Sequence, residues 1–208
     1  MRILIVALCL VSVLAAVVPF IDLEEPIKDA KCIVDKYKVI SLQVMGPNGK
    51  IHHNFAKNAD LLKKAASDVY IGGFAHPCMN CTITQQVADI KKAIDAAKAD
   101  SMVSIMVEGK WGDNPANNVK FLKDFLAEYQ KVGLKGAIIS HEMAWRKIMG
   151  PSTDFKDIPL WWINHDNKPD ITSFKAFGGW TKDNVMAKQY TPHSAVCEIK
   201  VNLDSQYH

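Results

Sequence analysis

Two acidic residues stand where short apolar segments of the sequence end. Asp22 follows an apolar segment that begins at residue 17, and Glu108 follows another that begins at residue 102. If both segments are strands of one parallel sheet, the two carboxylates project from the same edge. There, paired acids can serve as a general acid and as a nucleophile or base on a glycosidic bond. A strand also commonly ends in a solvated acid, so the pair, rather than either residue alone, indicates chemistry on a sugar.

Aromatic residues occur in the same parts of the chain. Flat rings suit the apolar faces of sugar rings, although packing in the core is their more ordinary role. The rings that follow or occupy expected strands are Trp111, Trp161, Trp162, Trp180 and Tyr190.

His165 and Asp166 follow another expected strand and could bind a substrate hydroxyl or contribute to a metal site. A metal site needs a second ligand pair, and the sequence offers none that is clear. We therefore expect no metal and no other cofactor.

Composition places limits on the class of protein. The chain has 208 residues, with 25 basic and 22 acidic side chains and 49% hydrophobic residues. This length and apolar content suit one compact domain and exclude a disordered chain. The net charge of +3 is too small, and too dispersed, to indicate nucleic-acid binding.

The first residues indicate the compartment. Met1 and Arg2 precede the apolar run 3–14, which has the pattern of a secretory signal, and Val13 and Ala15 suit cleavage. The alternatives are a buried strand or a retained anchor, but the run is short for a membrane span. We expect a signal peptide at 1–16, a single domain at 17–208, a secreted or lumenal location that includes the lysosome, and no membrane attachment after cleavage.

Removal of this segment also removes Cys9 and leaves four cysteines, which in an oxidising compartment predict two disulfides with three possible connectivities. They are Cys32, Cys78, Cys81 and Cys197. The CxxC at 78–81 could instead be a redox motif or half of a zinc site. We favour a local Cys78–Cys81 bridge and a Cys32–Cys197 bridge that joins the ends of the domain. Asn80 begins a glycosylation sequon that overlaps Cys81.

Strand and helix patterns alternate along the first 150 residues. Apolar, β-branched runs predict buried strands at 17–23, 39–44, 69–75, 102–108 and 137–141. Helical spacing and end signals predict helices at 26–36, 58–66, 84–98, 118–132 and 142–149.

Beyond residue 151 the helical period does not return. Strands are expected at 160–164, 175–180, 187–191 and 199–203. Parallel strands with helical crossovers form either an open doubly wound sheet or a closed barrel. Because strands alone can close a barrel, we favour a single barrel domain.

Several short motifs, in order, resemble the family-25 glycoside hydrolases, and in particular the small secreted lysozymes of nematodes and protists. The motifs are residues 20–26 (FIDLEEP), the helix with Cys32, 74–81 (FAHPCMNC), 107–109 with Trp111, 158–162 (IPLWW), 177–180 (FGGW) and 188–190 (KQY). The resemblance implies an α/β fold, an irregular TIM-like barrel of five β/α units followed by three closing β-strands. It also implies cleavage of the β-1,4 bond after N-acetylmuramic acid in peptidoglycan.

Two acidic residues of the family pattern are replaced in this chain. Asp22 matches the acid that ends the first strand, and Glu108 matches the general acid of an Asp-x-Glu motif. The Asp of that motif falls on Met106, and an acid near the last strand falls on Asn202. Residues two apart on a strand share a face about 6.6 Å apart, so the family can place two cooperating carboxylates there. Methionine can neither activate water nor stabilise positive charge.

The sequence thus predicts a lysozyme-like protein, active in antibacterial defence or digestion, with weakened hydrolysis. The alternatives are a glycan-binding protein without turnover and an enzyme for another acetamido sugar, such as chitin. The expected partner is peptidoglycan or a related polymer, and we expect a monomer. The substrate-binding residues are predicted to be Trp111, Trp162, His165, Gln189 and Tyr190.

Overall fold

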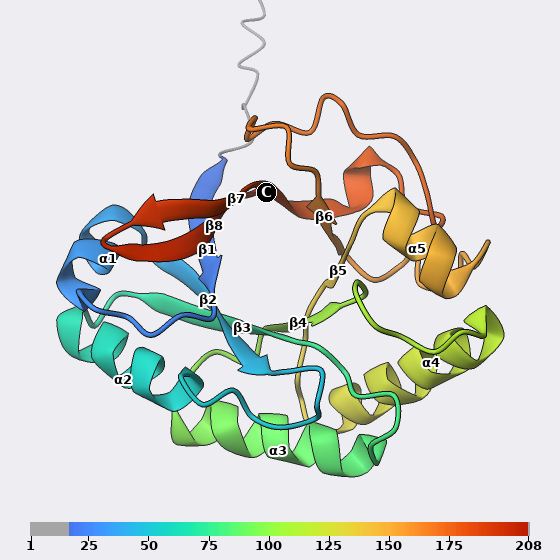
Figure 1. The fold of residues 1–208 in the computed structure, drawn as a ribbon, viewed down its shortest axis with the longest axis horizontal. Helices are drawn as coiled ribbons and strands as arrows, with labels where there is room; N and C mark the ends of the chain where they lie inside the picture. Colours follow the sequence, from blue (N-terminus) through green and yellow to red (C-terminus); the bar gives the residue numbers. More distant parts are fainter. Residues whose placement is uncertain (1–16, 208) are drawn as a thin grey trace, which may run out of the picture.

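The computed structural model describes residues 17–207, so the predicted signal peptide and Cys9 lie outside the described residues. Eight strands form a closed barrel in chain order (Figure 1). The strands are β1 (Val18–Leu23), β2 (Val39–Met45), β3 (Tyr70–Ala75), β4 (Val103–Met106), β5 (Ile138–Ser140), β6 (Leu160–Ile163), β7 (Val185–Val196) and β8 (Ile199–Gln206).

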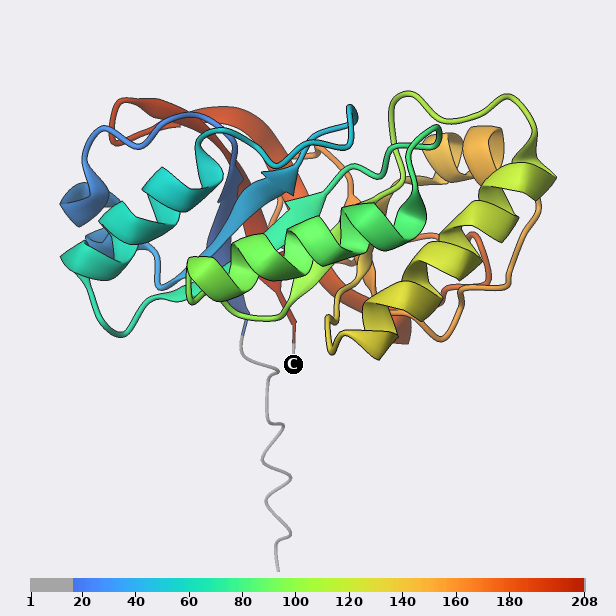
Figure 2. The ribbon, with the colours of Figure 1, turned by 90° about the horizontal axis from the view of Figure 1, so that it is seen from below.

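Helices alternate with the first five strands and lie outside the barrel (Figures 1 and 2). They are α1 (Ala30–Lys36), α2 (Phe55–Ala65), α3 (Ile83–Ala96), α4 (Pro115–Lys131) and α5 (Glu142–Met149). A short 3₁₀ turn, η1 (Lys182–Asn184), precedes β7. Within residues 17–207, none of the helices has the length and apolar character needed to cross a membrane.

Strand pairing follows the predicted pattern of five β/α units and three closing strands. Each strand from β1 to β6 pairs in parallel with the next. β8 pairs antiparallel with both β7 and β1, which brings Asn202 opposite Asp22. The barrel is therefore confirmed, and the open sheet is excluded.

Strand alternation divides the core into two layers. Ile21 points outward into a large cluster that includes helix residues such as Ile33 and Leu62. Phe20, one residue earlier, points the other way and packs with Trp161 in a smaller cluster inside the barrel. Because residues two apart share a face, Asp22 also points inward.

The starts of α1, α2 and α4 differ from the prediction by three or four residues, and α4 begins at Pro115 instead of residue 118. The helix expected from residue 26 begins at Ala30, because the Asp29 side chain accepts a hydrogen bond from the Cys32 backbone N–H at 2.9 Å and caps the helix there. The helix expected from residue 58 begins at Phe55. Asn58 is therefore inside the helix, where its side chain binds the backbone of Ile27.

The predicted strand at 175–180 is wrong. Gly178 and Gly179 adopt φ values of 58° and 85°, and the chain turns back so that Phe177 makes an isolated bridge to Trp180. These left-handed conformations are open to glycine and break an extended strand. The predicted strand 102–108 is also too long: β4 ends at Met106, and Glu108 lies in the following loop.

Both predicted disulfides are present. Cys32 and Cys197 join α1 to the turn between β7 and β8, with Cα atoms 5.9 Å apart. Cys78 and Cys81 close the loop before α3, and the exposed Asn80 lies inside that loop. The first bridge joins residues 165 positions apart in the sequence, so it constrains most of the chain in the unfolded state.

Candidate functional site

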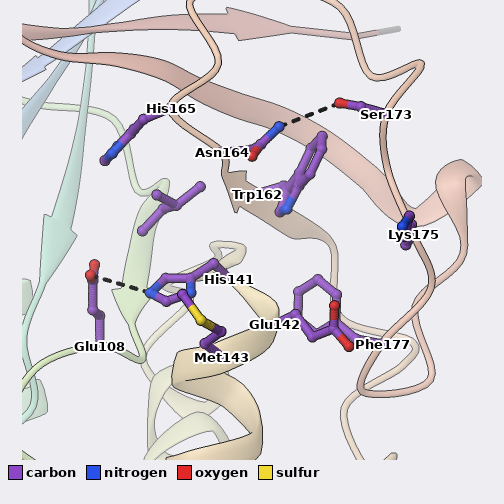
Figure 3. Close-up of a pocket in the computed structure, with 11 residues that line it drawn as sticks. Glu108, His141, Glu142, Met143, Trp162, Asn164, His165, Ser173, Lys175 and Phe177 are labelled. Atoms are coloured by element: carbon purple, nitrogen blue, oxygen red, sulfur yellow. Dashed lines mark hydrogen bonds and ion pairs between the residues drawn. The ribbon is translucent and has the colours of Figure 1, made fainter.

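Glu108 lies on the wall of a pocket of about 410 Å³ at the carboxyl ends of the barrel strands. Its side chain is 43% exposed. The other walls come from the start of α5, the end of β6 and the loop that follows β6 (Figure 3). The lining residues include His141, Glu142, Met143, Trp162, Asn164, His165 and Lys175. A solvent-accessible acid in a concave site of this size suits a ligand with polar groups.

His141 is the nearest ionisable partner of Glu108. Its Nε2 lies 3.5 Å from Glu108 Oε1, as the dashed line in Figure 3 marks. His141 is also the N-cap of α5, because its Nδ1 accepts a hydrogen bond from the Ala144 backbone N–H at 3.4 Å. The helix start therefore orients the ring toward Glu108.

Trp162 supplies an aromatic surface to the pocket and is held from two sides. The Phe174 ring packs edge-on against it with centroids 5.1 Å apart, and Lys188 Nζ lies 4.9 Å from its ring centroid. Lys188 is fully buried and donates to the Asp166 carboxylate at 2.7 Å and to the Asp170 carbonyl at 2.8 Å. These contacts fix the position of the Trp162 ring.

The Asp166 carboxylate is paired with Lys188 and is not free to bind a ligand. Burial alone would raise the pKa of Asp166, but hydrogen bonds from Lys188 and from the Lys168 backbone hold it below its ordinary value. Asp166 thus anchors the loop after β6 rather than offering a metal ligand. Within residues 17–207, no group of three or more His, Cys, Asp or Glu side chains is arranged to hold a metal ion.

Asp22 is buried inside the barrel, and both of its oxygens accept hydrogen bonds. Asn202 Nδ2 donates to Oδ1 at 2.9 Å, and Gln189 Nε2 donates to Oδ2 at 2.7 Å. The Gln189 Oε1 in turn lies 2.8 Å from Nε2 of His165, which must be the donor because an amide oxygen only accepts. This network links Asp22 to the Glu108 pocket, because His165 lines that pocket.

Asp204, on β8, is a second buried acid near Asp22 and was missed in the sequence analysis. It is fully buried, and its Oδ1 accepts a hydrogen bond from Trp161 Nε1 at 2.8 Å. Its Oδ2 has no hydrogen-bond partner among the described residues. Burial and the neighbouring Asp22 raise the pKa of Asp204 well above its ordinary value. The raised pKa favours the protonated, uncharged form of Asp204. Asp204 lies two residues after Asn202 on β8, so both side chains point to the inward face. This spacing is the feature of the sequence from which Asp204 could have been identified.

Burial also raises the pKa of Asp22, and hydrogen bonds from Gln189 and Asn202 offset part of that rise. An ionised Asp22 disfavours ionisation of Asp204, because like charges repel.

Asp204→Asn is expected to stabilise the protein above neutral pH. The folded-state pKa of Asp204 lies above the unfolded value, so its stabilising contribution is full below about pH 3.8 and is lost as the pH rises toward the folded pKa. Each unit of upward shift corresponds to about 1.4 kcal/mol. An asparagine amide is uncharged at every pH and can still accept the hydrogen bond from Trp161. Denaturant unfolding from pH 4 to pH 9 should therefore show a gain that grows with pH.

The exposed Asp157 provides a control, because Asp157→Asn should change the unfolding free energy by the same small amount at every pH from 4 to 9. If the unfolding free energies of Asp204→Asn and the wild type differed by a constant amount from pH 4 to pH 9, the raised pKa of Asp204 would be contradicted.

Met106 and Asn202 face a second, smaller pocket. This pocket, of about 160 Å³, also borders Asp22, Phe74 and His76. Met106 is buried among the apolar residues of the barrel interior. The surface beside Asp22 is therefore apolar at Met106 and an amide at Asn202.

Of the five rings singled out in the sequence, Trp162 lines the Glu108 pocket. Trp111 packs edge-on against Phe121, with centroids 6.0 Å apart. Trp161 lies inside the barrel, and Trp180 is fully buried. Tyr190 is half-buried beside the loop after β6, where its carbonyl accepts from the Asn167 N–H at 3.0 Å. Met143, 75% exposed at the pocket rim, is an apolar contact surface that the sequence analysis did not single out.

Solved muramidase and lysozyme structures share the fold of this barrel. A family-25 lysozyme from Aspergillus fumigatus superimposes with a TM-score of 0.71 over 93% of this chain and 95% of that chain, at 14% identity. A muramidase from Acremonium alcalophilum superimposes with a TM-score of 0.70 over 92% and 93% of the two chains, at 13% identity. At these identities the likeness concerns the fold.

Sequence comparison gives more specific relatives. A probable GH family 25 lysozyme 5 from Dictyostelium discoideum is 27% identical over 184 residues, covering 83% of this chain and 80% of the relative. Lysozyme-like protein 5 from Caenorhabditis elegans is 25% identical over 204 residues, covering 93% of each. The family model described as "Lysozyme-like protein 1" matches residues 15–190. Because that match spans most of the chain, the protein belongs to the lysozyme-like family of the family-25 glycoside hydrolases.

Proposed function

We propose that this protein is a secreted lysozyme-like protein that binds bacterial peptidoglycan and slowly hydrolyses the β-1,4 bond after N-acetylmuramic acid, in antibacterial defence or digestion. The observation that carries this proposal is the accessible Glu108 carboxylate in a pocket backed by Trp162. Family membership supports peptidoglycan as the substrate class.

Glu108 takes the role of general acid. In its protonated form it gives a proton to the glycosidic oxygen as the bond to the sugar breaks, and positive charge develops on the sugar ring. Trp162 holds an apolar sugar face, and His165 offers a polar contact from the loop that follows β6.

The site offers little stabilisation of the positive charge that develops on the sugar ring. Met106 contributes no charge, and the Asp22 oxygens already accept hydrogen bonds from Asn202 and Gln189. Loss of one positioned acid, base or charge-stabilising group typically lowers a rate by about 10² to 10⁴. Slow turnover follows from this arrangement.

The second candidate is a peptidoglycan-binding protein without turnover. Met106, Asn202 and the fully engaged Asp22 favour it, because none of them can assist Glu108 by acting as a free carboxylate. Secretion as a single domain at 17–208 is part of both proposals, and the two disulfides support an oxidising compartment.

Sedimentation with insoluble peptidoglycan tests the binding that both candidates share. Trp162→Leu should weaken binding by up to about tenfold, since an aromatic contact contributes about 0.5 to 1.5 kcal/mol. Tyr70→Leu is the matched control, because this exposed ring begins β3 at the other end of the barrel and should leave binding unchanged. Thermal melting checks that Trp162→Leu still folds. Absence of wild-type binding, or equal loss in both variants, would refute the placement of the sugar in this pocket.

A further inference from the structure

His141 contacts two different partners through its two ring nitrogens. Nδ1 faces the Ala144 backbone N–H, and Nε2 faces Glu108 Oε1. A backbone N–H can only donate, so Nδ1 must present its lone pair. In the neutral ring the proton therefore sits on Nε2 and points at Glu108.

The cap of α5 alone does not explain an imidazole at this position. Ser, Thr, Asp and Asn are the residues that usually cap a helix N-terminus, and each offers one short side-chain acceptor. Histidine caps α5 through one nitrogen and has a second nitrogen that reaches the loop after β4. The reach to Glu108 is what distinguishes it from the usual caps.

We propose that His141 is a positioning residue for Glu108, whose Nε2–H holds Oε1 so that Oε2 carries the acid proton toward the substrate. This inference rests on the proposed function of Glu108 as general acid.

The contact should strengthen during the reaction. When Glu108 is protonated, Oε1 is a neutral carbonyl oxygen, and its separation of 3.5 Å from Nε2 is longer than an ordinary hydrogen bond. As the Oε2–H bond breaks and the proton passes to the glycosidic oxygen, negative charge spreads over both carboxylate oxygens. A donor aimed at developing charge stabilises the transition state more than the ground state. His141 keeps its own proton throughout, so the proton balance involves Glu108 and the leaving oxygen alone.

His141→Asn separates this role from helix capping. Asparagine is a favoured N-cap, so α5 and the melting temperature should be preserved, but its short side chain lacks the nitrogen that reaches Glu108. Hydrogen bonds to charged groups contribute about 1.5 to 3 kcal/mol. We therefore expect kcat on peptidoglycan to fall by about tenfold to a hundredfold with KM nearly unchanged. In a Glu108→Gln background the same change should have no further effect.

Nuclear magnetic resonance of the histidine rings tests the inference without turnover. Long-range ¹H–¹⁵N spectra of the wild type should show His141 as the Nε2–H tautomer, and Glu108→Gln should shift the Nε2 signal. An Nδ1–H tautomer would overturn the proposal, and so would an Nε2 signal that does not shift in Glu108→Gln. So would a His141→Asn protein with unchanged kcat. If the wild type shows no hydrolysis, the proposed function fails, while the ring spectra still decide the His141 contact.

Discussion

Glu108→Gln is expected to lower the rate of peptidoglycan hydrolysis by at least about 10²-fold while wall binding stays within about twofold of the wild type. Glutamine has nearly the same shape as glutamate and can still accept from His141, but it has no acid proton to give. The exposure of Glu108 means that this change creates no buried defect. Reducing ends released from purified peptidoglycan measure the rate, and sedimentation with the same material measures binding.

Glu142→Gln is the matched control for this variant. Glu142 is an acid of the same pocket with the same 43% side-chain exposure, and it pairs with Arg146 on α5. It should lose little activity. If Glu142→Gln abolishes hydrolysis and Glu108→Gln does not, the general acid has been assigned to the wrong residue.

Met106→Asp is expected to raise hydrolysis by about 10² to 10⁴, the range associated with a positioned catalytic group. Met106 ends β4 and borders the small pocket beside Asp22 and Asn202. An aspartate there would supply the charge that the present surface lacks. Met106→Asn is the matched control, because it has the same shape without charge and should give no gain.

The companion change Asn202→Asp is expected to act differently. Asn202 donates a hydrogen bond to Asp22 at 2.9 Å, and Asp204 lies on the same face of β8. Asp at residue 202 would remove that donor and bring three carboxyl groups together, so Asn202→Asp should lower stability. We therefore expect Met106→Asp alone to give the clearer gain. A folded Met106→Asp protein, and a folded double variant, both with wild-type rates, would show that these replacements do not limit catalysis.

The barrel could be predicted from the sequence because its strands are short apolar runs separated by amphipathic helices. Both layers of the core follow from alternation along strands such as β1. The strand predicted at 175–180 was wrong. The aromatic and apolar content of this segment resembles that of a strand, but the positive φ angles of Gly178 and Gly179 turn the chain. The predicted helix starts were wrong where an N-cap residue sets the first turn, as Asp29 does for α1.

The candidate site was less predictable than the fold. Glu108 and Trp162 were found because the ends of parallel strands meet at one edge of the barrel. Asp204 and His141 were missed because their roles depend on three-dimensional partners: Asp204 on Trp161 and His141 on Glu108. The expectation of two cooperating acids on the barrel edge was also incomplete, because Asp22 is buried and engaged in hydrogen bonds.

The most direct test of the central claim is the rate at which reducing ends appear when purified peptidoglycan is incubated with the wild type, Glu108→Gln and Met106→Asp side by side. We predict a slow wild-type rate that clearly exceeds that of Glu108→Gln, and a faster rate for Met106→Asp. A wild-type rate equal to that of Glu108→Gln would contradict catalysis at Glu108 and would leave a protein that binds the wall without cutting it.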